Sequence, residues 1–400
     1  MATKKRTGPV SSPKTAAKKP VKADKKVVLK TKSPEDDLRE AIGAGDGVIE
    51  AIAFSDEAVI GHVKRVCSTR SLALDKLTGY WGLPFGRIIE ISGKEQSGKT
   101  TAVQQIAAET QSMGGVVALY DTEEKWDRVY ARLCGVDVDR CLSIQPTNVK
   151  PEEEEDGDES TKETKKEAKA KKKKDASRGN KTIEDGIAAI DRALQAWIDK
   201  GHKIPLTIIW DSIAGTPTQS ELADLTDKQP GVAARELRRA MRVLTSKVAR
   251  AGCLLVLVNQ TYEKIQTFGF GPKSTTYGGG AIRYHATMRF EFVRTGYLKH
   301  TNGTVLGIEG EAKLIKNSLG AQGVVSYAIA HGRGFDNAWT LLEKLKEAKY
   351  VTVKPGGNYV FAVQGEAPVV WKGGFAELDS MMRADPNLTA RLVSIFKAIP

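Results

Sequence analysis

The chain has 400 residues, 40% of them hydrophobic, so it is long enough for more than one average domain and can bury a sizeable core. Its longest apolar stretches, such as 253–258, have the length of a strand, which excludes a membrane-spanning helix. The four cysteines and five histidines show neither a disulfide framework nor the spacing of a metal site. Since the N-terminus also has no apolar signal region, we expect a cytoplasmic protein, of a bacterial cell or of a phage-infected host.

The net charge of +12 is concentrated at the N-terminus, where residues 1–33 hold eleven Lys and Arg against the single acid Asp24. They predict a disordered basic arm, which either binds the phosphate backbone of a nucleic acid or acts as a solubilising tail. Residues 151–181 hold as many acids as bases and no aromatic or large aliphatic side chain. They predict a disordered charged insert, either a solvated loop or a segment that binds a partner.

The remaining residues predict an α/β fold. Residues 35–65 look helical, and from residue 87 onward apolar strand-length segments alternate with helical patterns. Because these strands are apolar on both faces, they predict a mostly parallel sheet covered on two sides. We expect strands at 87–92, 116–121, 142–146, 206–211 and 253–260, and helices at 99–113, 125–133, 183–199 and 231–250. After Gly280 a period of two predicts antiparallel or mixed strands at 286–293 and 324–330, and 336–400 is expected to form a small α+β domain.

The segment 93–100, GKEQSGKT, matches the pattern G-x-x-x-x-G-K-[ST] between a predicted strand and a predicted helix. In this pattern backbone N–H groups and the helix N-terminus bind phosphates, Lys99 reaches the β- and γ-phosphates, and the Thr100 hydroxyl binds Mg²⁺. The chain has no N-K-x-D guanine signature, so we predict ATP rather than GTP. The loop residues predicted to bind ATP are Gly93, Lys94, Glu95, Gln96, Ser97 and Gly98.

Three polar positions stand at the ends of predicted strands. Asp211 is expected to organise Mg²⁺ through water, or else to cap a helix. A carboxylate at 123 or 124 could orient the water that attacks the γ-phosphate, and the sequence does not separate Glu123 from Glu124. Gln260 could hydrogen-bond the γ-phosphate through its amide, or merely cap the strand.

Several segments resemble the bacterial RecA recombinases and their phage relatives. They are 82–101, 121–139, 209–222, 231–244 and 257–286, and they follow one another in the order of that family. The resemblance implies a RecA-type P-loop ATPase core with an N-terminal helical segment and a small C-terminal domain. It also implies a DNA-dependent ATPase that forms helical filaments on single-stranded DNA and exchanges homologous strands in recombination and repair.

Matched by motif position, the resemblance implies roles for individual residues. Glu123 resembles the catalytic glutamate, and Gln260 resembles the γ-phosphate sensor that opens onto a second DNA-binding loop at about 261–278. A first DNA-binding loop is expected at about 222–231. The implied ATP contacts include Thr101, Asp127, Tyr130 and, from a neighbouring protomer, Lys316; the implied DNA contacts are Arg235, Arg242, Lys264, Gly278 and Gly279. Phe268 or Phe270 is expected to pack at the interface between protomers.

The resemblance divides the chain into four parts. These are the arm 1–33, an oligomerisation segment 34–80, the ATPase core 81–335 with the insert 151–181, and the domain 336–400. The cofactors it implies are ATP and Mg²⁺. The partners it implies are single- and double-stranded DNA, further copies of the chain and a self-cleaving repressor of the SOS response. Two other functions fit the same core: a hexameric helicase or translocase, and a non-catalytic DNA-binding regulator.

Overall fold

The computed structural model describes residues 34–43, 52, 55–56, 62–146, 181–223, 231–263, 274–300 and 303–399. The chain divides into two units, Met1–Val59 and Ile60–Pro400. The predicted arm lies outside the described residues, and so does the predicted insert apart from Lys181. In the first unit, α1 spans Pro34–Gly43, and of the rest of the helix expected over 35–65 the described residues 52, 55 and 56, and 62–65 in the second unit, are not helical. Gly43 is the last residue of α1, and glycine weakens helix formation.

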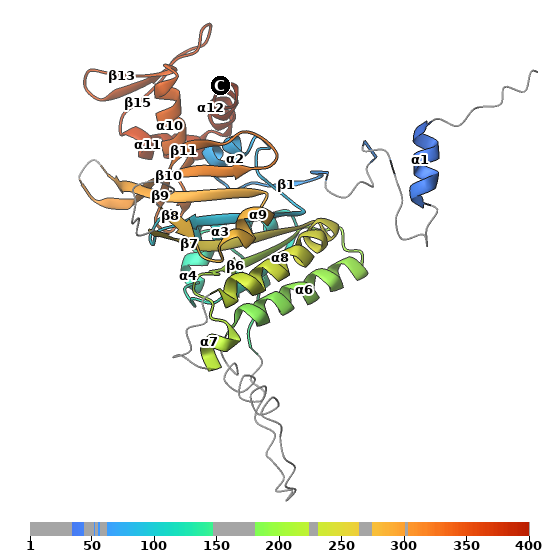
Figure 1. Ribbon diagram of the computed structural model, residues 1–400. Helices are drawn as coiled ribbons and strands as arrows, with labels where there is room; N and C mark the ends of the chain where they lie inside the picture. The colour runs from blue at the N-terminus through green and yellow to red at the C-terminus, as the bar shows by residue number, and fades with distance from the viewer. Residues whose placement is uncertain are drawn as a thin grey trace, which may run out of the picture. The chain divides into compact units, whose positions relative to one another are not determined.

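A sheet of ten strands forms the centre of the second unit (Figure 1), in the order β12-β11-β10-β9-β3-β7-β6-β4-β5 with β8 paired to β7. The neighbours from β5 to β9 are parallel, and the strands beyond β9 are antiparallel. The parallel strands are β3 (Arg87–Gly93), β4 (Val116–Asp121), β5 (Cys141–Ser143), β6 (Leu206–Asp211), β7 (Cys253–Glu263) and β9 (Met288–Lys299). The others are β8 (Ser274–Thr276), β10 (Val305–Asn317), β11 (Gly323–Ala330) and β12 (Gly334–Phe335). The predicted mostly parallel sheet with a mixed extension is confirmed.

Helices cover both faces of this sheet. One face carries α6 (Ile183–Asp199) and α8 (Val232–Ala251), side by side in Figure 1, together with α9 (Gly280–His285). The other face carries α3 (Lys99–Ser112), α2 (Leu72–Thr78) and the short ribbon of β1 (Val66–Cys67) and β2 (Leu83–Pro84). Short helical turns connect the layers at α4 (Arg128–Leu133), η1 (Val138–Arg140) and α7 (Gln219–Ala223).

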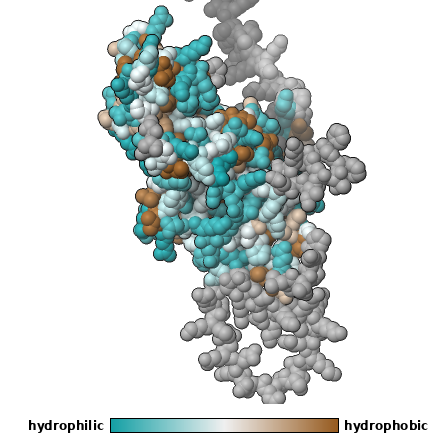
Figure 2. Space-filling view, turned by 90° about the vertical axis from the view of Figure 1, so that its left-hand side faces the viewer, coloured by the Kyte–Doolittle hydropathy of each residue, from teal (hydrophilic) through white to brown (hydrophobic). Residues whose placement is uncertain are grey.

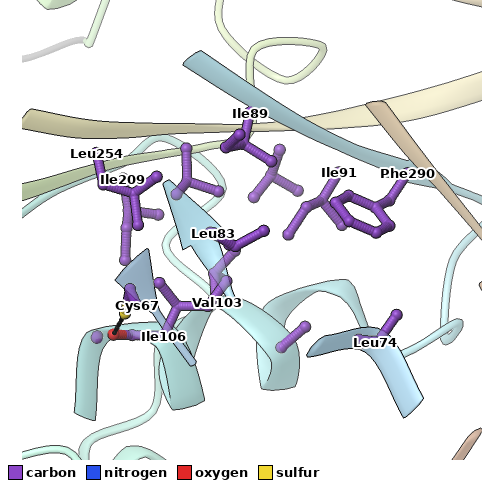
Figure 3. Close-up of a cluster of buried hydrophobic side chains, with 14 of the residues drawn as sticks. Cys67, Leu74, Leu83, Ile89, Ile91, Val103, Ile106, Ile209, Leu254 and Phe290 are labelled. Atoms are coloured by element: carbon purple, nitrogen blue, oxygen red, sulfur yellow. Dashed lines mark hydrogen bonds between the residues drawn. The ribbon is translucent and has the colours of Figure 1, made fainter. Parts of the chain in front are cut away.

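Successive side chains of β3 pack on opposite faces. Ile89 and Ile91 face Val103 and Ile106 of α3 (Figure 3), whereas Ile88 belongs to the core beneath α6 and α8. Because both faces of the sheet are covered, the neighbouring positions Ile88 and Ile89 are both apolar and buried, although they point to opposite faces.

A smaller module follows the sheet and is part of the same unit. It contains α10 (Asn337–Glu347), β13 (Val351–Lys354), β14 (Asn358–Phe361), β15 (Val369–Trp371), α11 (Gly374–Ala384) and α12 (Pro386–Ala398). Its three strands are antiparallel, and they share a core with the helices that includes Leu341, Phe361 and Leu392. On the face seen in Figure 2, hydrophilic residues predominate and hydrophobic ones form separate patches. No helix in the part of the chain that the structure describes is long and apolar enough to cross a bilayer.

Candidate nucleotide-binding site

The loop between β3 and α3 is held by two close approaches to the sheet. A Cβ on Gly93 would lie 2.3 Å from the carbonyl oxygen of Phe292 in β9. A Cβ on Gly98, whose φ is +88°, would lie 2.3 Å from the Ile329 side chain in β11. Glycine at both positions therefore lets the loop wrap tightly in front of the N-terminus of α3, as phosphate binding requires.

Lys99 turns back over this loop. Its Nζ donates hydrogen bonds to the carbonyl oxygens of Gly93 at 3.0 Å and of Lys94 at 2.8 Å. Burial lowers the pKa of Lys99, and the carboxylates of Asp211 and Glu123 act against that effect. An anionic phosphate in the loop would compete with the two neutral carbonyls for this ammonium group.

Thr100 and Asp211 meet at the carboxyl ends of the strands. Thr100 Oγ1 donates to Asp211 Oδ2 at 3.2 Å, and the indole N–H of Trp126 donates to the same oxygen at 3.1 Å. The backbone N–H of Trp126 donates to Asp121 Oδ2 at 3.0 Å, while the buried Asp121 Oδ1 has no hydrogen-bond partner among the described residues. Burial raises the pKa of Asp211 to about 6, and the nearby charge of Asp121 adds to that effect.

This donor set fits Mg²⁺ bound together with a nucleotide. It offers a hydroxyl and buried carboxylate oxygens, which are hard oxygen ligands. In the part of the chain that the structure describes, no group of three or more His, Cys, Asp or Glu side chains could hold a metal on its own. Mg²⁺ usually keeps several waters and takes further oxygens from phosphates, so a partial protein ligand set is what the ion needs.

The structure separates Glu123 from Glu124, which the sequence left together. Glu123 Oε1 accepts hydrogen bonds from Gln260 Nε2 at 2.8 Å and from the Ser212 hydroxyl, and its Oε2 pairs with Lys125 Nζ at 2.7 Å. Burial alone would raise the pKa of Glu123, but these hydrogen bonds outweigh it and hold that pKa below its ordinary value.

The side chain of Glu124 is 79% exposed and pairs with Lys181 at 3.4 Å. It lines a cavity of about 460 Å³ whose wall includes Asp121, Trp126 and Asp127 but not Glu123. Of the two carboxylates, Glu123 is the one that shares the site with Lys99, Asp211 and Gln260.

The other predicted nucleotide contacts lie at two different places. Tyr130 OH is 3.0 Å from Thr101 Oγ1, so α4 packs beside the start of α3. Asp127 caps α4 by accepting the backbone N–H of Tyr130 at 2.7 Å, which is why this helix begins at Arg128 rather than at 125. Lys316 donates to the carbonyl oxygens of Arg283 at 2.9 Å and of Tyr284 at 3.0 Å, at the end of α9 rather than at the loop of its own chain.

The predicted DNA contacts that the structure describes lie on α8 and just before α9. Arg235 and Arg242 are exposed on α8, as are Arg238 and Arg239. Gly278 and Gly279 have φ of +81° and +60°, and a Cβ on Gly278 would lie 2.9 Å from Leu237 Cδ1 of α8. The two glycines therefore run against the same half of α8 that carries Arg235. Lys264, Phe268, Phe270 and residues 224–230 of the predicted first loop lie outside the described residues.

Trp126, Ser212 and Lys125 are side chains that sequence reasoning did not place in the site. Each touches a predicted functional carboxylate, but Trp126 is separated from Asp211 by 85 positions and Ser212 from Glu123 by 89. No periodicity or motif connects positions so far apart. Lys125 lies two residues from Glu123, and a local charge pattern is the one signal that could have suggested it.

Comparison with known proteins identifies a family for this chain. A family model described as the RecA N-terminal domain matches residues 45–154 and 186–336. The chain belongs to the RecA family. A curated Protein RecA from Cytophaga hutchinsonii is 30% identical over 310 residues, which is 77% of this chain and 74% of that protein. Those from Blastochloris viridis and Brucella suis are 33% identical over 281 residues and 31% identical over 302 residues, covering 69% and 75% of this chain and 68% and 71% of the relatives.

The RecA family consists of DNA-dependent ATPases. The two matched ranges contain every strand of the parallel part of the sheet and also β10 to β12. The gap between them, 155–185, falls largely within the charged insert predicted from composition. Membership in this family therefore rests on the part of the chain that carries the nucleotide site.

Proposed function

We propose that this RecA-family chain is an ATP-dependent recombinase, which assembles as a helical filament on single-stranded DNA and pairs it with homologous double-stranded DNA. The observation that carries the proposal is the 2.8 Å hydrogen bond from Gln260 Nε2 to Glu123 Oε1. It joins a carboxylate beside the nucleotide loop to β7, and β7 pairs with β8 just before Gly278 and Gly279. β7 therefore links the side chain that would sense the nucleotide to the segment that would contact DNA.

In the proposed reaction the loop N–H groups and the N-terminus of α3 bind the phosphates of ATP. Lys99 exchanges its carbonyl partners for phosphate oxygens. Thr100 and Asp211 would hold Mg²⁺, which when bound neutralises charge on the β- and γ-phosphates. Glu123 orients the attacking water, and Gln260, which is already hydrogen-bonded to Glu123, senses whether the γ-phosphate is present.

The remaining predicted contacts take a place in the same proposal. Asp127 and Tyr130 would contact adenine, and Tyr130 lies beside Thr101. Lys316 stands near the end of α9, from where it would reach the ATP of a neighbouring copy in the filament. Arg235 and Arg242 supply charge for the DNA backbone. Exchange of one base-paired strand for another is close to isoenergetic, so ATP binding is needed to stabilise the DNA-bound state rather than to drive pairing itself. Cleavage of a repressor stays a prediction from the resemblance.

Trp126→Phe is expected to raise the Mg²⁺ concentration for half-maximal ATP binding by about tenfold, as for other partners of metal ligands. The indole N–H is one of two donors that fix Asp211 Oδ2, and phenylalanine removes the donor while keeping most of the ring. Equilibrium binding of a fluorescent ATP analogue across a Mg²⁺ titration measures the change. The control is Trp197→Phe, because the Trp197 N–H is buried without a partner in the described part of the chain. Superimposable Mg²⁺ titrations for wild type and Trp126→Phe would show that the indole does not position Asp211.

The proposed function is tested by binding to labelled single-stranded oligonucleotides with ATP, a non-hydrolysable analogue, ADP or no nucleotide. We expect tight binding with the triphosphates and weak binding otherwise, continuous helices in negative-stain images, and formation of joint molecules with homologous duplex DNA. Closed rings that unwind duplexes would instead indicate a helicase or translocase. DNA binding without any ATP hydrolysis would indicate a regulator.

A further inference from the structure

A buried ion pair lies between the nucleotide site and the DNA-facing glycines. Glu90 in the middle of β3 has 0% exposure, and its Oε2 pairs with the Nε of Arg289 in β9, whose side chain is 10% exposed. Charges removed from water in this way are costly unless they are fully paired and hydrogen-bonded. Most buried side chains of this sheet are apolar, so packing alone would place hydrophobic side chains where this pair lies.

On one side the pair connects to the nucleotide site. Glu90 Oε1 accepts a hydrogen bond from Asn259 Nδ2 at 2.8 Å. Asn259 Oδ1 in turn accepts the backbone N–H of Gln260 at 2.9 Å, and Gln260 Nε2 donates to Glu123 Oε1 at 2.8 Å. A displacement of the Gln260 backbone on nucleotide binding would therefore act on Asn259 and, through Asn259, on the carboxylate of Glu90.

On the other side the pair connects to β8. Arg289 Nη2 donates to Thr276 Oγ1 at 3.2 Å, and Asn259 Nδ2 also donates to the carbonyl oxygen of Tyr277 at 3.0 Å. Gly278 and Gly279 follow at once and run against α8. Asn259 thus contacts both Gln260 and Tyr277, and Arg289, which pairs with Glu90, contacts Thr276 just before the candidate DNA-facing glycines.

We propose that Arg289, held by Glu90, is a positioning residue that couples nucleotide state to DNA affinity through Thr276. The inference rests on the proposed function, and it adds a second connection to the one that β7 itself makes. The guanidinium is suited to this role because its planar fork reaches two partners at fixed angles. When Gln260 moves with the γ-phosphate, the polar network transfers the change to β8, and β8 sets the position of Gly278 and Gly279.

The test uses Thr276→Val in the full chain, because removing Glu90 or Arg289 outright would leave a buried charge unpaired and the fold could fail. Valine has the shape of threonine and removes only the hydroxyl that Arg289 contacts. The readout is the coupling factor, the ratio of the DNA dissociation constants with ADP and with a non-hydrolysable ATP analogue. We expect Thr276→Val to lower this ratio by at least about fivefold while ATP affinity without DNA stays unchanged. Arg289→Lys, which keeps the charge beside Glu90 but loses the fork, should lower it as well.

The matched control is Thr275→Val on the same strand. The Thr275 side chain is exposed and makes no hydrogen bond with the described residues. The coupling factor of Thr275→Val should therefore equal that of the wild type. Linkage gives a second readout, because DNA must then enhance ATP affinity by the same reduced factor in Thr276→Val. A wild-type coupling factor in Thr276→Val, with the wild type itself strongly coupled, would overturn this inference alone. A wild type that binds DNA equally with ATP and ADP would overturn the proposed function as well.

Discussion

Glu123→Gln is expected to lower steady-state ATP turnover by about 10²–10³-fold, the usual loss on removing a positioned base. The amide keeps the size of the side chain and can still accept hydrogen bonds from Ser212 and Gln260. It lacks the negative charge that orients and deprotonates water. Binding of ATP and of single-stranded DNA should be retained, so an equilibrium binding measurement beside the ATPase assay separates loss of chemistry from loss of affinity.

Glu124→Gln is the matched control for this prediction. Its carboxylate is exposed and its partner is Lys181 rather than Gln260, so turnover should stay close to that of the wild type. If Glu124→Gln abolished hydrolysis and Glu123→Gln did not, the assignment of the catalytic carboxylate would be wrong by one residue.

Asp211→Asn is expected to have opposite effects on activity and on stability. The variant should lose Mg²⁺-dependent ATP turnover by about 10²-fold, because Thr100 would then lack its carboxylate partner. Without ligands it should be more stable than the wild type near neutral pH. Burial raises the pKa of Asp211 from 3.8 to about 6, so the folded wild type holds an unfavourable charge there.

The pH dependence follows from the direction of that shift. The folded state binds the proton of Asp211 more tightly than the unfolded chain does. Protonation of Asp211 therefore stabilises the folded state fully below about pH 4, and this stabilisation is lost as the pH rises through about 6. At about pH 7.5 the loss amounts to about 3 kcal/mol, at about 1.4 kcal/mol for each unit of the pKa shift, and the neutral amide would recover it. Below about pH 4 the variant and the wild type should unfold alike.

Urea denaturation at about pH 7.5 and below about pH 4 measures the difference in the free energy of unfolding between the wild type and Asp211→Asn, with Asp139→Asn as the control. The Asp139 side chain is 85% exposed, so its substitution should change the free energy of unfolding by less than about 0.5 kcal/mol. Added ATP and Mg²⁺ should stabilise the wild type but not Asp211→Asn. Equal stability of the wild type and Asp211→Asn at neutral pH would contradict the burial argument.

The sequence predicted those parts of the fold whose signal is local. The strands expected at 116–121 and 206–211 and the helix expected at 183–199 have the same bounds as β4, β6 and α6. The two strands are nearly continuous apolar runs of strand length and the helix has apolar residues at helical spacing, so a short window contains the information. The helix expected over 35–65 is wrong at 52, 55, 56 and 62–65, the described residues after α1, because the apolar spacing there is interrupted by glycines that weaken a helix.

In the candidate site, too, the sequence predicted only the part whose signal is local. The phosphate loop is a run of consecutive residues whose glycines, lysine and threonine are all visible in the sequence. Only the tertiary structure decided that Glu123 rather than Glu124 meets Gln260, that Trp126 holds Asp211, and that Glu90 pairs with Arg289. These contacts join positions 137, 85 and 199 residues apart. Such partners are chosen by the order and register of the strands in the sheet, and neighbouring residues along the chain carry no record of which strand ends will lie side by side.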